Sequence, residues 1–552
     1  MLSTLQRQAA SAVRRQITAP AAVQTSTSAI ASARRSLHVS AQRSAVVCKL
    51  NPPTRSPATE ATAPTPARLA TRMLINGELV SRSSDGGAFE SICPADGRVI
   101  KGAEAIPQAS SSDVDRAVQA AHAAFMRRGE GSWSSLSPRQ RGALLYKLSE
   151  LISAHAEELA VLESLDNGKT LSQSRTVDAP ACASMFKYWA GWGDKMEGGR
   201  VIDVGGAFFN YTLHQPVGVC ALVVPWNLPL IAAAAKMGPS LVAGNTIVLK
   251  PAEQTPLSTL RLAELVVEAG FPKGVVNIVP GDGSTGAALC QHPLVSKISF
   301  TGSTPVGQKV GAQAALSCKR VSLELGGKNP VIVCRDADVD AAVEAVHAGV
   351  FWNEGEACAS GSRIFVHDSL YDQFLAKSVA RAQKRKVGHS FSADAAQGSQ
   401  VSQEQMDKIL GYISGAQKQG AKLELGGYRM GSSGFYVAPT VFSGITDAMT
   451  VSQEEIFGPV MCLGRFSEVE EVIARANATP FGLAAGVFTK DQSLGQHLTR
   501  SLHAGIVFWN CYHAVDVSAP FGGMKQSGMG REGGGMYGLE AYLEVKNVVQ
   551  KL

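Results

Sequence analysis

The stretch TIVLKPAEQTPLSTLRLAELVVEAGFPKGVVNIV, residues 246–279, contains the alternation that decides the fold. An apolar, β-branched run at 246–250 is followed by a helical pattern at 256–269, and a second apolar run spans 275–279. Short apolar runs bounded by Gly and Pro predict strands, and the longer run with helical spacing predicts a helix. A strand, a crossover helix and a second strand predict a βαβ unit in a mostly parallel sheet.

The same alternation continues along the chain in both directions. The predicted strands are 217–224, 297–300, 330–334 and 363–366, and the predicted helices begin at about 230 or span 306–315 and 338–351. The second strand series opens directly after Glu324 to Lys328. We therefore expect an α/β fold with two doubly wound parallel-sheet domains that meet near these residues.

Composition is that of an ordinary globular protein. The chain has 552 residues, of which 45% are hydrophobic and 18% charged, so it is long enough for two or three domains. Among its ten cysteines the closest pair, Cys318 and Cys334, lies too far apart for a C-x-x-C zinc or redox motif. We therefore expect free thiols in a reducing compartment and no metal site.

Residues 1–59 differ from the rest of the chain. They contain eight basic residues, many Ser, Thr and Ala, and no acid, and Arg7 and Arg14 lie opposite an apolar helical face that includes Leu5 and Val13. This pattern predicts a mitochondrial transit peptide in a disordered leader, with a plastid leader or a plain disordered tail as alternatives. Setting these eight aside leaves 44 of the 52 basic residues against 46 acids. The basic excess therefore gives no indication of nucleic-acid binding.

The uncharged stretch from Pro216 to Ala235 has the length of a membrane span. Pro225 and Pro229 remove two backbone donors near its middle and Asn227 adds a polar amide, which a lipid-exposed helix does not accommodate. We therefore expect a buried strand, a polar loop and a helix here, and no membrane span.

Cys358 and Glu324 are the candidate nucleophile and base. Both lie in glycine-containing segments, Cys358 in GEACASG and Glu324 in ELGGK. A thiolate can attack a carbonyl, and the thioester that forms needs a base to activate water. A cysteine taken alone is more commonly a small buried hydrophobe, so the surrounding motifs decide between the two interpretations.

Six motifs occur in order along the chain. They are Pro225-Trp-Asn227, Lys250-Pro-Ala-Glu253, Phe300-Thr-Gly-Ser-Thr-Pro-Val-Gly307, Glu324-Leu-Gly-Gly327, Gly355-Glu-Ala-Cys358 and Glu454-Glu-Ile-Phe457-Gly-Pro459. Together they resemble the aldehyde dehydrogenase superfamily, and the cytosolic class 1 and mitochondrial class 2 enzymes look most similar. The resemblance runs from about Leu74 to Leu552.

This resemblance implies NAD-dependent oxidation of an aldehyde to its acid. Cys358 attacks the carbonyl, the Asn227 amide and the Cys358 backbone N–H hold the oxyanion, and Glu324 activates the water that cleaves the thioester. Two alternatives stay open. In a CoA-acylating relative CoA replaces water and the hydrolytic Glu is absent, and a non-catalytic member of the fold is expected to lack the nucleophile. The presence of Glu324 and Cys358 argues against both.

The resemblance also implies where NAD binds. Gly302, Ser303 and Gly307 form a two-glycine turn between a strand and a helix, where backbone N–H groups can hold a pyrophosphate. Taken alone, such a turn is more commonly an ordinary one. Lys250 and Glu253, otherwise a surface ion pair, hold the adenine ribose hydroxyls, and the carboxylate favours NAD over NADP.

Further roles follow in the same way. Glu455 and Phe457 position the nicotinamide ribose and ring, or else form an acidic turn with a core Phe. We assign Trp226 to the cofactor site, although a pocket wall or a core position fits it as well. Glu532 resembles a family carboxylate near the water path or is an exposed structural acid. Glu356 stands in place of the usual Gln, and we expect it to raise the thiol pKa.

The resemblance implies several segments and a homotetramer. After the transit peptide and leader at 1–59, which composition predicts, the segments are a cofactor-binding domain at 73–197 and 217–326, an oligomerisation hairpin at 198–216, a catalytic domain at 327–526, and a C-terminal oligomerisation strand at 541–552 that pairs between subunits. The expected location is the mitochondrial matrix. The expected partner is a small aldehyde, with no nucleic acid.

The substrate pocket is where the sequence departs from the acetaldehyde-oxidising relatives. Ala232 and Ala235 stand where those enzymes carry Met and Trp, and Val515 stands where they carry Phe. Three smaller side chains in the pocket wall leave volume that a two-carbon substrate does not fill, unless neighbouring side chains repack into it. We therefore expect a preference for bulky or aromatic aldehydes.

Overall fold

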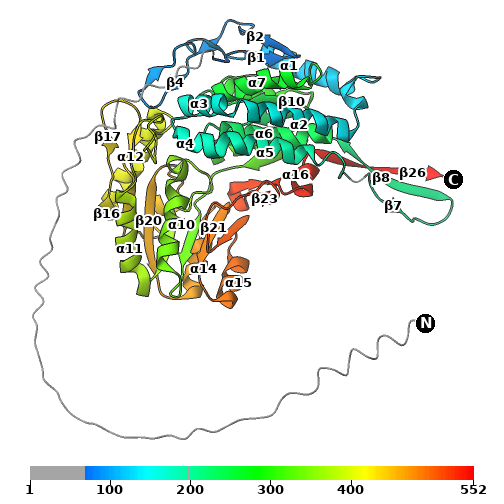
Figure 1. Cartoon of the computed structure of the whole chain (residues 1–552). Coiled ribbons are helices and arrows are strands. Elements are labelled where there is room, and N and C mark those ends of the chain that lie inside the picture. The colour runs from blue at the N-terminus through cyan, green and yellow to red at the C-terminus, as the bar shows by residue number, and fades with distance from the viewer. Residues whose placement is uncertain (1–68, 197) are drawn as a thin grey trace, which may run out of the picture. The chain divides into compact units, whose positions relative to one another are not determined.

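A computed structural model of the chain describes residues 69–196 and 198–552. The predicted transit peptide and leader at 1–59 lie outside the described residues. Two large sheets and a smaller three-stranded sheet organise the described part, with helices packed on the large sheets (Figure 1).

The first large sheet is parallel at its centre and antiparallel at its edges. Its strands are, in spatial order, β2 (Glu78–Val80), β1 (Met73–Ile75), β11 (Val276–Ile278), β10 (Thr246–Lys250), β9 (Val219–Val223), β12 (Val295–Thr301), β13 (Arg320–Glu324) and β24 (Gly528–Met529). β9 and β10 are buried along their whole length. Continuous apolar runs such as these are typical of parallel strands covered on both faces.

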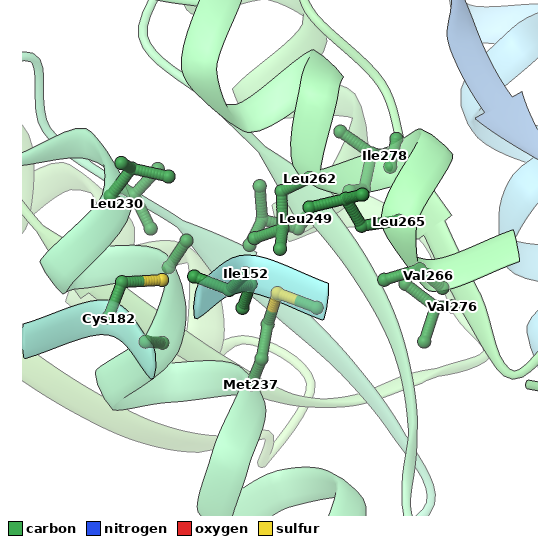
Figure 2. Close-up of a cluster of buried hydrophobic side chains, with 14 of the residues drawn as sticks. Ile152, Cys182, Leu230, Met237, Leu249, Leu262, Leu265, Val266, Val276 and Ile278 are labelled. Atoms are coloured by element: carbon green, nitrogen blue, oxygen red, sulfur yellow. The ribbon is translucent and has the colours of Figure 1, made fainter. Parts of the chain in front are cut away.

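Helices cover this sheet on both faces because successive side chains of a strand point to opposite sides. Ile247 and Leu249 of β10 pack in one hydrophobic cluster, while Val248 packs in another. Figure 2 shows the first cluster, where Leu249 lies beside Leu262. On that side are α2 (Pro138–Ala154), α3 (Ala156–Asn167), α5 (Ala179–Ala190), α6 (Pro229–Ala243) and α7 (Leu257–Ala269). On the other are α1 (Ser111–Met126), α8 (Gly283–Gln291) and α9 (Thr304–Ala315).

The second large sheet is parallel apart from one edge strand. Its strands are, in order, β16 (Lys422–Leu425), β19 (Thr440–Ser443), β20 (Val460–Phe466), β15 (Arg363–His367), β14 (Pro330–Val333), β21 (Ala484–Phe488) and β22 (Ile506–Trp509). The main helices around it are α10 (Val339–Phe351), α11 (Asp368–Gln383), α12 (Gln403–Lys418), α14 (Val469–Asn477) and α15 (Gln492–Ser501).

The α/β fold with two parallel-sheet domains is confirmed, and the chain passes from the first sheet to the second between β13 and β14, as predicted. The uncharged stretch from Pro216 to Ala235 forms β9, a loop and the start of α6. No helix in the part of the chain that the structure describes is long and apolar enough to cross a membrane.

The small sheet joins a hairpin to the C-terminal end of the chain. It consists of β26 (Leu543–Lys551), β8 (Phe208–Pro216) and β7 (Val201–Ile202), in that order. β26 pairs antiparallel with β8 from Leu543 opposite Pro216 to Lys551 opposite Phe208. One edge of β26 is therefore paired within its own chain, and pairing of this strand between subunits stays a prediction that concerns its other edge. Only its outer edge is left for another subunit.

Candidate active site

The predicted nucleophile follows a strained loop. Cys358 is half-buried and lies just after a 3₁₀ turn, Trp352–Gly355, in which Asn353 and Glu354 have φ values of 51° and 58°. Such left-handed conformations cost non-glycine residues energy and occur where surrounding structure enforces them. The Asn329 amide donates to the carbonyl oxygens of Cys358 and Ser360 at 2.9 and 2.8 Å. The backbone on either side of the thiol is therefore fixed.

The predicted base lies at the end of β13 with a free oxygen. Glu324 is buried, and its Oε2 has no hydrogen-bond partner among the described residues. Burial raises the pKa of Glu324 well above its usual range, the Glu532 carboxylate raises it further, and Lys236 partly offsets both. A carboxylate with a raised pKa is a stronger base than an ordinary one, and its unoccupied oxygen is available to accept a proton.

Lys236 and Glu532 form a charged pair next to this base. The Lys236 side chain is fully buried, and its ammonium group donates to Glu532 and to Ser299 Oγ, the latter at 3.0 Å. Glu532 is therefore an ion-pair partner near Glu324 and not an isolated surface acid. Sequence reasoning missed Lys236. Its signal was present, because Lys236 is the first charge after the long uncharged stretch.

Asn227 lies in the loop between β9 and α6 and reaches the catalytic loop. It is buried, and its Nδ2 donates to the carbonyl oxygen of Glu356 at 2.9 Å. An amide NH₂ group carries two hydrogens, so one remains for an oxyanion. The structure thus brings the predicted oxyanion donor and the Cys358 loop into direct contact.

The thiol of Cys358 is protonated in this environment. Burial raises its pKa to about 12, with further contributions from the Glu455 and Glu324 carboxylates. Glu356 was expected to cause this rise, but its Oε1 accepts from the Val401 backbone N–H at 3.2 Å, and burial raises its own pKa. The two carboxylates that raise the thiol pKa are thus Glu455 and Glu324.

The two-glycine turn is tightly packed. A Cβ on Gly302 would come within 2.5 Å of the Phe300 ring, and one on Gly307 within 2.2 Å of Leu325. Ser303 is the exposed N-cap of α9, and its side chain makes no capping hydrogen bond. Free backbone donors at a helix N-terminus and an uncommitted hydroxyl fit a pyrophosphate.

Lys250 and Glu253 lie close together at the end of β10. The buried Lys250 ammonium donates to the Pro251 carbonyl at 2.9 Å and to Glu253 Oε2 at 3.4 Å. The Glu253 side chain keeps 39% of its surface exposed. A buried lysine with one hydrogen left and a reachable carboxylate suits the hydroxyl groups of a ribose.

Glu455, Phe457 and Trp226 form a second group near the nucleophile. Glu455 accepts from the Gly327 backbone N–H at 3.0 Å, and a Cβ on Gly326 would lie 2.2 Å from its Oε2. Phe457 has a φ of 57°, and its ring meets that of Trp226 edge-on at 5.1 Å. Both rings are half-buried, so Trp226 is not a core residue and is available to contact a bound molecule.

The trimmed pocket positions remain accessible. Ala232 and Ala235 are half-buried on α6 although Ala233 and Ala234 between them are fully buried, and Val515 is 52% exposed. The two alanines share one face of the helix because they are three residues apart.

Comparisons with known proteins agree with this geometry. The model of the aldehyde dehydrogenase family matches residues 80–548. Mitochondrial aldehyde dehydrogenase of Rattus norvegicus is 49% identical over 466 residues, covering 84% of this chain and 88% of the relative. Mitochondrial benzaldehyde dehydrogenase of Antirrhinum majus is 47% identical, with 87% and 89% covered. The NAD⁺ complex of the Bacillus cereus aldehyde dehydrogenase superposes with a TM-score of 0.85 at 44% identity, covering 88% of this chain and 97% of that one.

Proposed function

Because the chain belongs to the aldehyde dehydrogenase family, we propose that it oxidises bulky or aromatic aldehydes to acids through a thioester on Cys358. It is an NAD-dependent aldehyde dehydrogenase. The observation that carries the mechanism is the hydrogen bond of the Asn227 amide to the loop that carries Cys358, together with the unpartnered oxygen of the buried Glu324, whose charge acts on the thiol.

The first step is attack on the aldehyde. Cys358 Sγ forms a bond to the carbonyl carbon, its proton leaves, and the carbonyl oxygen becomes an oxyanion that accepts from the free hydrogen of the Asn227 amide and from the Cys358 N–H. Because burial raises the pKa of Cys358 to about 12, the thiol loses its proton as the bond forms, and this half-exposed side chain passes the proton to solvent water.

NAD, when bound, would accept the hydride that leaves the substrate carbon, and with that loss the oxyanion adduct becomes the thioester. On this chain Lys250 and Glu253 hold the adenine ribose, and the turn at Gly302, Ser303 and Gly307 holds the pyrophosphate. Glu455, with Phe457 and Trp226, holds the nicotinamide end. Glu455 fits this role because burial raises its pKa to about 7 while the Gly327 N–H fixes one oxygen, leaving the other for a ribose hydroxyl.

The second step is hydrolysis. Glu324 takes a proton from water, the water oxygen bonds to the acyl carbon, and the carbon–sulfur bond breaks to release the acid and return the thiol. The ion pair of Lys236 and Glu532 sets the charge around Glu324, because Glu532 raises its pKa and Lys236 lowers it.

The substrate class follows from the accessible surface of Ala232, Ala235 and Val515. Each methylene that a larger substrate buries contributes on the order of 1 kcal/mol, or about fivefold in specificity. A benzaldehyde dehydrogenase among the relatives supports an aromatic substrate. We expect phenylacetaldehyde to exceed acetaldehyde in kcat/KM, and Ala235→Trp to narrow the gap while Ala233→Gly, on the buried face, does not.

We extend the proposal to domains, location and assembly. The cofactor-binding domain comprises 73–197 and 217–326 and the catalytic domain 327–526, with the arm at 198–216 and 541–552. Relatives named mitochondrial support import into the matrix through the leader at 1–59. The outer edge of β26 supports a homotetramer, and a chain ending at residue 540 is expected to sediment as a smaller species.

One experiment separates the function classes. Purified protein is mixed with NAD and phenylacetaldehyde, with and without CoA, and NADH, acid and thioester products are measured. Acid formed without CoA supports hydrolytic oxidation. A requirement for CoA identifies an acylating enzyme, and no NADH with any aldehyde of a panel from two to ten carbons identifies a non-catalytic protein.

A further inference from the structure

A buried charge cluster lies behind the loop that carries Asn227. We define this cluster as Glu163, Asp166, Lys169 and Asp178, all at most 1% exposed. The Lys169 ammonium donates to Asp178 Oδ1 at 2.9 Å and lies 3.6 Å from Glu163 Oε1. A buried cation flanked by two carboxylates is held firmly in place, because moving it would leave a charge unpaired.

The local backbone directs these side chains inward. α3 ends at Gly168 with a φ of 92°, and a Cβ there would lie 2.6 Å from Ser399 Oγ, so only glycine fits this reversal. Lys169 follows at once. Asp178 is the last residue of a π-helical turn, Ser174–Asp178, which precedes α5. Single π turns within helices are rare and are frequent at functional sites.

The third contact of Lys169 is not to an acid. Its ammonium donates to the backbone carbonyl oxygen of Asn227 at 3.0 Å, and Asn353 Nδ2 donates to the same oxygen at 3.3 Å. Asn167 Nδ2 donates to the preceding Trp226 carbonyl at 2.7 Å and reaches the Asn227 carbonyl at 3.4 Å. A carbonyl oxygen has two lone pairs, whereas three donors lie within hydrogen-bond distance of the Asn227 oxygen. The position of this peptide is therefore firmly fixed.

The same donors connect Asn227 to the nucleophile loop. Asn353 Nδ2 also donates to the Glu356 carbonyl at 2.9 Å, and this oxygen accepts from the Asn227 side chain as well. Gln173 orients Asn353 by donating to its Oδ1 at 2.7 Å. The backbone of Asn227 and the start of the nucleophile loop are therefore held in one network.

The cluster keeps its cation charged. Burial alone would lower the pKa of Lys169, but Asp178 and Glu163 outweigh it and raise the pKa above its usual value. Burial raises the pKa of Glu163 to about 7, and Lys169 opposes that rise. A permanent positive charge therefore faces the Asn227 carbonyl at neutral pH, and a hydrogen bond from a charged donor is stronger than a neutral one.

From this arrangement we propose that Lys169 is a positioning residue for the oxyanion site, which fixes the Asn227 peptide so that the side-chain amide points at the reacting carbonyl. The inference rests on the proposed function, because it assigns Asn227 the oxyanion. Lys169 itself does not touch the substrate. Misplacing a catalytic group by a fraction of its working distance costs rate without abolishing binding.

The test is a double-mutant cycle read in the pre-steady-state burst of NADH with phenylacetaldehyde. Lys169→Met keeps the length of the side chain and removes the donor. We expect it to slow the burst about tenfold in the wild-type background. In the Asn227→Ala background, where no amide is left to position, we expect it to cost less than about threefold. The dissociation constant for NAD should stay within about twofold of wild type.

Two further variants protect the test. Lys169→Met combined with Asp178→Asn removes the ammonium together with the carboxylate to which it donates, and should slow the burst to the same degree even if the single variant is unstable. Lys319→Met is the matched control, because Lys319 also donates to a backbone carbonyl, that of His292, but away from the Asn227 loop. Its burst rate should equal wild type.

The two proposals fail in different ways. Equal losses for Lys169→Met in both backgrounds, or an unchanged burst in the variant, overturn the positioning role and leave the dehydrogenase intact. A wild-type protein that forms no NADH from any aldehyde overturns the proposed function first.

Discussion

The two sides of Cys358 are built in opposite ways. On one side the Asn227 carbonyl receives three donors and its side chain is hydrogen-bonded to the Glu356 carbonyl. On the other, Glu324 has an oxygen without any partner among the residues described. The difference matches the tasks proposed for them, because an oxyanion donor must already be in place when charge develops. A base must be free to turn toward its proton and away again.

The largest effect is expected from replacing Cys358, which tests whether Asn227 and Glu324 act on the same sulfur atom. Cys358→Ser should lower kcat about 10⁴-fold or more, because a neutral hydroxyl is a far weaker nucleophile than a thiolate. NAD binding, measured by quenching of tryptophan fluorescence, should be unchanged. Loss of NAD binding together with activity would mean that Cys358 stabilises the fold and is not the nucleophile on which Asn227 and Glu324 act.

The next largest effect is expected from replacing Glu324, the residue with an unpartnered oxygen. Glu324→Gln keeps the shape and removes the base, so the acyl-enzyme should still form while its hydrolysis slows about 10³-fold. Stopped-flow absorbance should show a burst of NADH of about one equivalent per site, followed by a stall. Trapped acyl-enzyme should appear in the mass of the intact protein. Steady turnover at the wild-type rate would remove Glu324 from the mechanism.

The firmly held side should give a smaller loss spread over both steps. Asn227→Ala should slow the burst and the steady rate by about 10²-fold each, because an oxyanion forms during attack and again during hydrolysis. Thermal unfolding should show whether the loop survives, since Lys169 and Asn353 contact the backbone and not the missing side chain. A defect confined to hydrolysis would contradict the assignment.

The smallest effect concerns the pH profile. Burial first, and then the Glu532 carboxylate, raise the pKa of Glu324, while Lys236 lowers it. Glu324 acts as a base only when deprotonated, so hydrolysis slows as the pH falls through its pKa. Glu532→Gln removes a raising charge and frees Lys236, so the acid limb of kcat should move to lower pH. A limb that stays in place, or moves to higher pH, would separate Glu532 from the base.

Much of the fold could be predicted from local pattern. The strand at 246–250 was found with its observed bounds, because a β-branched run ends at a Pro that cannot continue the ladder. The helices on either side of it begin within two residues of the predicted positions, since Pro229 and Pro305 mark the first turns of two of them. The partner of β26 was not predicted within the chain, because sequence pattern does not identify which strand pairs with which.

The site residues that belong to sequence motifs could be predicted. Residues whose role depends on burial could not. The motif residues Cys358, Glu324 and Asn227 were identified beforehand, and the Asn227 amide contacts the loop that carries Cys358. Lys169 and Lys236 were not identified, because a lysine in a sequence is normally a surface residue. Each lysine is buried beside an acid, Asp178 nine residues along the chain for Lys169 and Glu532, 296 positions away, for Lys236. The left-handed conformation of Phe457 could not be predicted either, because Phe is not a residue type typical of that conformation.

The position of β24 has a consequence for how the protein is made. β24 pairs with β13 beside Glu324, and Lys236 meets Glu532 across 296 positions of sequence. A chain emerging from the ribosome therefore exposes its thiol and its oxyanion loop long before the residues that complete the surroundings of the base. The nascent chain can fold its sheets and yet has no finished hydrolytic site. The protein can therefore complete a catalytic cycle only after nearly all of the chain has been synthesised. A prematurely terminated chain can at most bind one aldehyde covalently at Cys358 and not release it.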